Sequence, residues 1–159
     1  MARTMLLLAL CVLPALVSAT RPLAEPFILE GKVYCDTCRL GYETSATTPI
    51  HGAKVRVVCK PRNSDKILYE KEATTDETGT YTMNVNEDHE DQICDAELLS
   101  SPQTDCATPD AGRDRARVIL TKNNGICSNK RYANAMGFMR DHPMSGCKQV
   151  LTQLMKLGA

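Results

Sequence analysis

The cysteines are the feature that most constrains how this chain can fold. Eight occur in 159 residues, and the first of them, Cys11, lies in an apolar leader. Seven remain after that leader: Cys35, Cys38, Cys59, Cys94, Cys106, Cys127 and Cys147. In an oxidising compartment such a set predicts a disulfide framework with one thiol left over. Counting alone leaves the connectivity open.

The leader decides the expected compartment. An apolar run from Met5 to Leu13 follows Arg3, and small residues stand at the end of the stretch, at Ser18 and Ala19. This is the pattern of a secretory signal peptide, so we predict a signal peptide over residues 1–19 with cleavage after Ala19. The run is too short for a membrane anchor, since a spanning helix needs about 20 apolar residues. Residues 20–159 suit one domain, secreted into the extracellular space.

Charge and aromatic content narrow the possible partners. The chain carries 19 Lys and Arg against 19 Asp and Glu, and it has no Trp. A near-neutral balance gives no support for nucleic-acid binding, which needs a basic face. Aromatic platforms for stacking are scarce.

Most of the chain has the period-two alternation of half-buried strands. In 53–60 the residues Ala53, Val55, Val57 and Cys59 share one face, and in 80–85 the apolar face is formed by Tyr81, Met83 and Val85. Segments 93–99 and 116–120 alternate in the same way. Turn residues at 76–79 predict that 67–74 and 80–85 form a hairpin.

Two further expectations follow from side-chain periodicity. Residues 147–157 place Cys147, Val150, Leu151, Leu154 and Leu157 at helical spacing, which predicts a short C-terminal helix with Gly158 as its cap. Cys59 and Cys94 lie on the apolar faces of their strands, so the two are expected to meet across the core between two sheets.

One segment carries a specific resemblance. Residues 30–39, Glu-Gly-Lys-Val-Tyr-Cys-Asp-Thr-Cys-Arg, resemble the signature of the Ole e I-like family of pollen proteins, and the likeness extends over residues 28–157. It continues through segments 50–55, 75–81, 88–90, 93–94, 101–102, 105–106 and 134–138 and ends at Cys147. Segments 50–55 and 75–81 are also similar to prealbumin-like β-sandwiches. The implied fold is all-β, a disulfide-stapled seven-stranded Greek-key sandwich or flattened barrel with a short C-terminal helix.

The resemblance also implies a disulfide pattern. The family uses six cysteines in three bridges, which become Cys35–Cys106, Cys38–Cys147 and Cys59–Cys94 in this chain. Bridges that close long loops restrict the unfolded chain, and each is typically worth about 2–4 kcal/mol. Cys127 has no counterpart in that pattern and is the expected unpaired thiol. Several members carry an N-glycan near this position, but here no Asn begins an Asn-x-Ser/Thr triplet, so no glycosylation is expected.

The residues that could take part in catalysis or metal binding fit structural roles better. The C-x-x-C of Cys35 and Cys38 lacks the helical context of a redox dithiol and the second ligand pair of a zinc site. His51, His89 and His142 stand in no nucleophile motif. The acidic segment 84–95 departs from a calcium-binding loop, because His89 occupies the position that requires Gly. No catalytic residue, metal or cofactor is expected.

The remaining candidate is a short basic run. Arg113, Arg115 and Arg117 are broken only by Asp114 and Ala116, and an acidic polysaccharide could bind there. The alternative is that they form the outward face of a strand.

Two functions from different classes remain. The resemblance implies a non-enzymatic extracellular protein that acts in pollen hydration, germination or pollen-tube growth, with a cell-wall polysaccharide or a cell-surface protein as its partner. Many members of the family are allergens. The second reading is a carbohydrate-binding module for acidic cell-wall polysaccharide.

Overall fold

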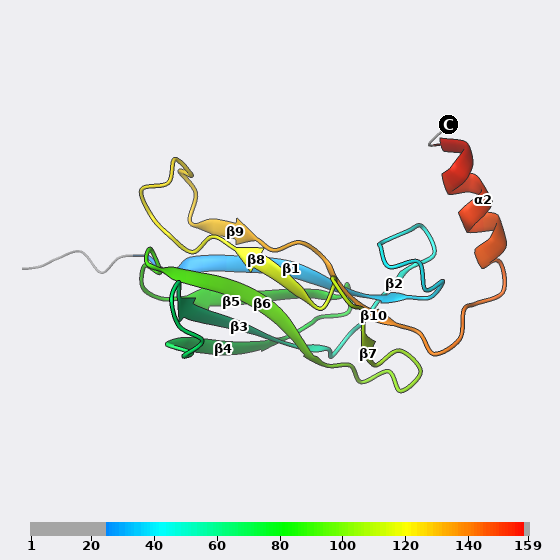
Figure 1. Ribbon diagram of the computed structural model, residues 1–159, viewed down its shortest axis with the longest axis horizontal. Helices are drawn as coiled ribbons and strands as arrows, with labels where there is room; N and C mark the ends of the chain where they lie inside the picture. The colour runs from blue at the N-terminus through cyan, green and yellow to red at the C-terminus, as the bar shows by residue number, and fades with distance from the viewer. Residues whose placement is uncertain (1–24, 158–159) are drawn as a thin grey trace, which may run out of the picture.

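A computed structural model describes residues 25–157 as two facing β-sheets with one helix beyond their end (Figure 1). The predicted signal peptide and the predicted cap at Gly158 lie outside the described residues. The elements are β1 (Phe27–Asp36), β2 (Thr48–Pro49), β3 (Lys54–Pro61), β4 (Tyr69–Thr74), β5 (Thr80–Val85), β6 (Gln92–Ser100), β7 (Thr108–Pro109), β8 (Arg115–Val118), β9 (Lys130–Tyr132), β10 (Met136–Met139) and α2 (Cys147–Leu157). Within that range, no helix is both long and apolar enough to cross a membrane.

The first sheet is organised around β1, which is long enough to have different neighbours along its length. Its first part, Phe27–Lys32, pairs with β5 in antiparallel register, and its last part pairs with β2. Along the other edge of β1, β9 and then β10 run parallel to it, at 28–30 and 33–36. The short strand β7 pairs with β10 in antiparallel register and so adds one more strand to this sheet. Thus β9 and β10 act as one interrupted strand.

The second sheet has the order β4-β3-β6-β8, with every neighbouring pair antiparallel. The chain leaves this sheet after β4, adds β5 to the first sheet, and returns as β6 on the other side of β3. With β9 and β10 counted together and the two-residue strands set aside, seven strands make up the sandwich. The predicted disulfide-stapled, all-β sandwich with a short C-terminal helix is confirmed.

The core follows the alternation seen in the sequence. Val55, Val57 and Cys59 of β3 are fully buried, as are Tyr81 and Val85 of β5. In β5 the other face is solvated, and in β3 it is partly exposed except at Val58, so the alternating residues supply both the core and most of the outer surface.

Tyr81 is packed against the one residue of β1 that leaves room for it. Gly31 is its direct cross-strand partner, and a Cβ added at Gly31 would lie 2.3 Å from the Tyr81 hydroxyl oxygen. The phenol is buried without a hydrogen-bond partner, and this burial raises the pKa of Tyr81.

The predicted hairpin between 67–74 and 80–85 is wrong. A turn does form at 76–79, where the Asp76 carboxylate accepts hydrogen bonds from the amides of Thr78 and Thr80. However, β4 pairs with β3 and β5 pairs with β1, so this turn carries the chain from one sheet to the other. Gly79 fits the crossing because its φ is +73° and a Cβ there would lie 2.6 Å from the Val33 carbonyl oxygen.

Thr75 fixes the start of this crossing. Its buried hydroxyl donates to the carbonyl oxygen of Ile50 at 2.6 Å and accepts from the amide of Ala53 at 2.9 Å. The backbone of Thr75 adds bonds to Gly52 and Ala53. One side chain therefore satisfies two buried backbone groups of the turn that leads into β3.

The helix α2 has the predicted bounds but does not pack on the sandwich core. Figure 1 shows it standing beyond the end of the sheets, where the bridge from Cys147 to Cys38 attaches it. On its apolar face Val150 and Leu154 are half-buried and Leu151 is exposed.

Candidate functional site

Three disulfides hold the molecule together, and they are the pairs that the family resemblance implies. The C-x-x-C does not close on itself: Cys35 is joined to Cys106, and Cys38 is joined to Cys147. The first bridge ties β1 to the loop before β7, and the second ties the turn just after β1 to the first residue of α2. Both sulfurs of the motif are therefore structural.

The third bridge, Cys59–Cys94, corrects an expectation about geometry. The two residues are direct partners on the adjacent strands β3 and β6, with Cα atoms 4.1 Å apart. The bridge therefore lies within one sheet and does not cross the core between two. The reason is the path of β5, which leaves the sheet and allows β6 to return beside β3.

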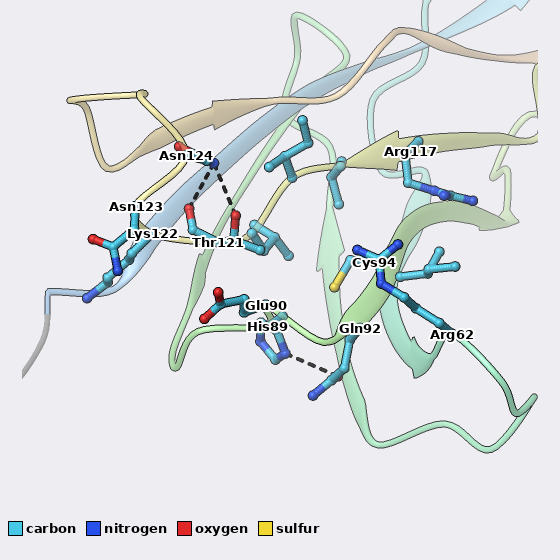
Figure 2. Close-up of a pocket in the computed structure, with 14 residues that line it drawn as sticks. Arg62, His89, Glu90, Gln92, Cys94, Arg117, Thr121, Lys122, Asn123 and Asn124 are labelled. Carbon is cyan, nitrogen blue, oxygen red and sulfur yellow. Dashed lines mark hydrogen bonds between the residues drawn. The ribbon is translucent and has the colours of Figure 1, made fainter.

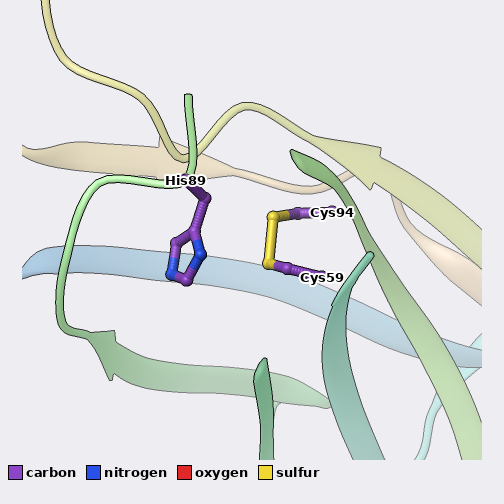
Figure 3. Close-up of side chains that lie close together, drawn as sticks. All are labelled: Cys59, His89 and Cys94. Carbon is purple, nitrogen blue, oxygen red and sulfur yellow. A yellow bond between two sulfur atoms is a disulfide. The ribbon is translucent and has the colours of Figure 1, made fainter. Parts of the chain in front are cut away.

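His89 lies beside this bridge (Figure 3). It is buried, and its Nδ1 and Nε2 lie 3.3 Å from the Gln92 side-chain oxygen and 3.2 Å from the Asn86 carbonyl oxygen. The ring also packs against Tyr69 with centroids 4.8 Å apart. One ligand atom from each of Cys59, His89 and Cys94 lies within 4.8 Å of the others. The disulfide leaves neither sulfur as a thiolate, so the cluster offers no nucleophile and no thiolate metal ligand while it is oxidised.

A hollow of about 420 Å³ opens next to His89, and we call it the end hollow. Figure 2 shows Arg62 and Arg117 at one side of it and Lys122 and Asn123 at the other. Three cations thus border a space whose wall also holds Glu90. Such a surface suits a polar or anionic ligand held at the surface, rather than a reaction that needs a dry pocket.

The three arginines of the basic run do not act together. Arg113 donates a hydrogen bond from Nε to the carbonyl oxygen of Gly41 at 3.2 Å. Arg115 and Arg117 stand on the exposed face of β8, where they pair with Asp114 at 3.5 Å and Asp95 at 2.6 Å. The side chains of both remain 61% exposed.

Arg131 organises the loop between β8 and β9, a role that no local sequence pattern indicates. The side chain is buried and its guanidinium donates to the carbonyl oxygens of Ile119, Thr121, Ser128 and Lys130. It also lies over the ring of Phe27, with 4.7 Å from the guanidinium carbon to the ring centroid. No carboxylate pairs with it among residues 25–157. Carbonyl dipoles and an aromatic face stabilise this buried charge.

Three buried polar side chains, Tyr34, Asp36 and Asp110, lie together at the opposite end of the sandwich from Arg131. Asp36 accepts hydrogen bonds from the amides of Cys38 and Gly41, while Oδ2 of Asp110 and the hydroxyl of Tyr34 have no partner in the protein. Burial, and then the nearby charge of Asp36, raise the pKa of Asp110. Nothing in the local sequence distinguishes this aspartate from an exposed one.

Comparison with known proteins decides the family. A family model described as "Pollen protein Ole e 1 like" matches residues 25–155. The chain belongs to the Ole e 1-like family. Two similar Ole e 1-like relatives are Protein DOWNSTREAM OF FLC of Arabidopsis thaliana, 50% identical over 89% of this chain and 86% of that protein, and Pollen-specific protein C13 of Zea mays, 43% identical over 93% and 87%.

A solved pollen allergen structure agrees with the fold. The major plantain pollen allergen Pla l 1 superposes with a TM-score of 0.67 at 29% identity, covering 76% of this chain and 98% of that chain. The β-sandwich of this chain is therefore similar to that of a solved pollen allergen.

Cys127 distinguishes this Ole e 1-like chain from the six-cysteine pattern. It lies at the exposed end of the β8–β9 loop and takes part in no disulfide of the described chain. Asn124 stabilises the adjacent turn at 123–125. Its Oδ1 accepts a hydrogen bond from the amide of Ile126 at 3.0 Å, and its Nδ2 donates to the carbonyl oxygen of Thr121 at 3.1 Å.

Proposed function

We propose that this chain is a secreted, non-enzymatic protein that acts outside the cell in pollen hydration, germination or pollen-tube growth. It would act by binding, through contacts with the cell wall or with a cell-surface protein. Family membership supports the setting, since relatives include a pollen-specific protein of Zea mays and a pollen allergen of plantain.

The state of the sulfurs and of His89 is the observation that carries the proposal. Six of the seven described cysteines are closed in bridges, which is the chemistry of an oxidising, extracellular compartment. Each ring nitrogen of His89 faces a protein oxygen, and the sulfurs beside the ring are closed in a disulfide rather than present as a reactive thiol. A nucleophile beside a free base, the minimum for covalent catalysis, is absent from this cluster. Binding is therefore the better-supported activity.

The test uses the secreted mature chain with its bridges intact. We expect added protein to change the germination or growth rate of pollen depleted of it, and to capture a wall fraction or a membrane ectodomain from pollen or stigma extract. Reduced and alkylated protein serves as the control, because it lacks the fold. If the native chain restores nothing and captures nothing beyond that control, the proposed function is wrong.

The second candidate is a carbohydrate-binding module for acidic cell-wall polysaccharide. The observation that favours it is the outward face of β8, where Arg115 and Arg117 are both largely exposed. Arg113 contributes less, since its Nε is bound to Gly41. Retention on immobilised pectate but not on its neutral methyl ester tests this function.

A further inference from the structure

We propose that a trough between β8 and β9 is a binding site for a chain of uronate sugars. The trough is formed by Arg117 on β8, by Ile119 and Ile126 in the loop, and by Lys130 and Tyr132 on β9. Its volume is about 580 Å³, and it neighbours the end hollow through Arg117 and Ile119. Figure 1 shows β8 and β9, one from each sheet, running along the same side of the sandwich. This inference rests on the second candidate function, binding of acidic cell-wall polysaccharide, and deepens it by placing the site in the trough rather than on the outward face of β8.

The first observation is exposed apolar surface gathered from separate segments. Tyr132 is 68% exposed, more than any other large apolar side chain in the described range. Ile119 and Ile126 are 55% and 48% exposed, and both line the same trough. Exposed apolar side chains that converge on a hollow mark a binding surface, whereas single scattered ones do not.

The second observation is charge. The charged side chains that line the trough are Arg117, Lys130 and Arg131, and no carboxylate lines it. Lys130 makes no ion pair within the described chain. Arg117 donates from Nε and Nη2 to the two carboxylate oxygens of Asp95, at 2.6 and 3.5 Å, which leaves the N–H groups of Nη1 to donate to a ligand. A ligand that presents carboxylates along an apolar backbone complements this lining.

A sugar chain suits the trough better than a peptide does. The face of the Tyr132 ring is electron-rich and can stack against the C–H groups of a pyranose, while Lys130, two residues away on the same exposed face of β9, can reach the ring carboxylate. A peptide would bind here most simply as an added strand. However, the amide of Lys130 already donates to Ser128 and its carbonyl already accepts from Arg131. Both backbone groups of Lys130 thus already have hydrogen-bond partners, so β9 is a poor edge for an added peptide strand.

The trough is also pre-formed. Arg131 lies beneath it and holds the carbonyl oxygens on both sides of the loop, at Ile119 and Ser128. The loop is therefore already ordered before a ligand binds. Less conformational entropy is lost on binding, which favours affinity.

The experiment measures binding of the secreted mature chain to an oligogalacturonate of about ten sugars, with its methyl ester and poly-glutamate as comparison probes. We expect the oligogalacturonate to bind and the methyl ester to bind at least about fivefold more weakly. Tyr132→Ala should weaken binding about tenfold, as expected for loss of one stacking contact, while Tyr132→Phe should stay within about twofold. Lys130→Gln should weaken binding and reduce its dependence on salt.

Matched controls lie away from the trough. Tyr42→Ala removes another exposed tyrosine, and Lys148→Gln removes another exposed lysine, on α2; both should leave binding unchanged. Each variant is first checked for an unchanged melting temperature.

Three results would overturn the inference: no binding of oligogalacturonate, equal losses in Tyr132→Ala and Tyr42→Ala, or equally tight Tyr132-dependent binding of poly-glutamate, which would assign the trough to an acidic protein. Absence of all oligogalacturonate binding would also overturn the second candidate function, whereas binding that Tyr132→Ala leaves unchanged would overturn only the trough. Neither result decides the germination assay, which tests the leading proposed function.

Discussion

Replacing Thr75 by valine should destabilise the sandwich far more than the small change in shape suggests. The hydroxyl bonds to the carbonyl oxygen of Ile50 and the amide of Ala53, two residues that are fully buried. Valine has almost the same volume but neither donates nor accepts. Both backbone groups would then lose this partner where water does not reach them.

The magnitude follows from the two orphaned groups. Each buried backbone group left without a partner costs about 1–3 kcal/mol, so Thr75→Val, which orphans two, should lower the free energy of unfolding by about 2–6 kcal/mol. For a domain of this size, a loss near the middle of that range corresponds to a fall in melting temperature of roughly 10 °C.

Two further variants separate the hydroxyl from packing. Thr75→Ser keeps the hydroxyl and loses a methyl group, which should cost about 1 kcal/mol. Thr74→Val alters the neighbouring threonine, which is exposed on β4, and should change stability by no more than about 0.5 kcal/mol.

The assay is denaturant unfolding with the disulfides intact, followed by circular dichroism. The reasoning predicts that serine is tolerated better than valine at position 75, the reverse of the order that hydrophobic burial alone would give. A valine variant as stable as the serine variant, or a loss of less than 1 kcal/mol, would refute the assigned role of the hydroxyl.

Three other predictions test the buried charges and the helix. Arg131→Met keeps the apolar stem and removes the donors, so amides in the loop 119–129 should exchange with solvent at least about tenfold faster in hydrogen-exchange measurements; unchanged exchange would contradict the role of the guanidinium. The raised pKa of Asp110 means that the folded state binds a proton more tightly than the unfolded chain, so this residue destabilises the fold as the pH rises through its ordinary pKa of 3.8 and beyond. Asp110→Asn should therefore gain stability relative to the wild type between pH 3 and pH 7 in thermal melts, and a constant difference would contradict that sign. The double variant Cys38→Ser and Cys147→Ser releases α2, whose 11 residues are too few for a stable isolated helix, so the helical ellipticity should fall while the sheet signal remains.

Several features of the fold followed directly from local sequence. Strand alternation is local, because successive side chains point to opposite faces, and it placed Val55, Val57 and Tyr81 on the apolar faces that are buried in the structure. The helical spacing after Cys147 predicted α2 with its bounds. The motif around Cys35 and Cys38 led to the family, and through it to all three bridges.

The local sequence did not predict which strands pair with one another. The sequence predicted a hairpin across the turn at 76–79 and a Cys59–Cys94 bridge across the core, and both were wrong in geometry. A turn signal states that the chain reverses, but whether the next strand stays in the same sheet depends on which edge is free, and that is a property of the whole sandwich.

The sequence by itself determined the faces of the strands, the family and the cysteines that take part in bridges, since these depend on residue type and spacing along the chain. Only the tertiary structure decided that His89 lies beside a disulfide, that Arg131 is buried under a loop, and that Tyr132 and Arg117 line one trough. Those contacts join strands of different sheets or residues distant in the chain. Their distances depend on how the two layers pack, and no local pattern records that.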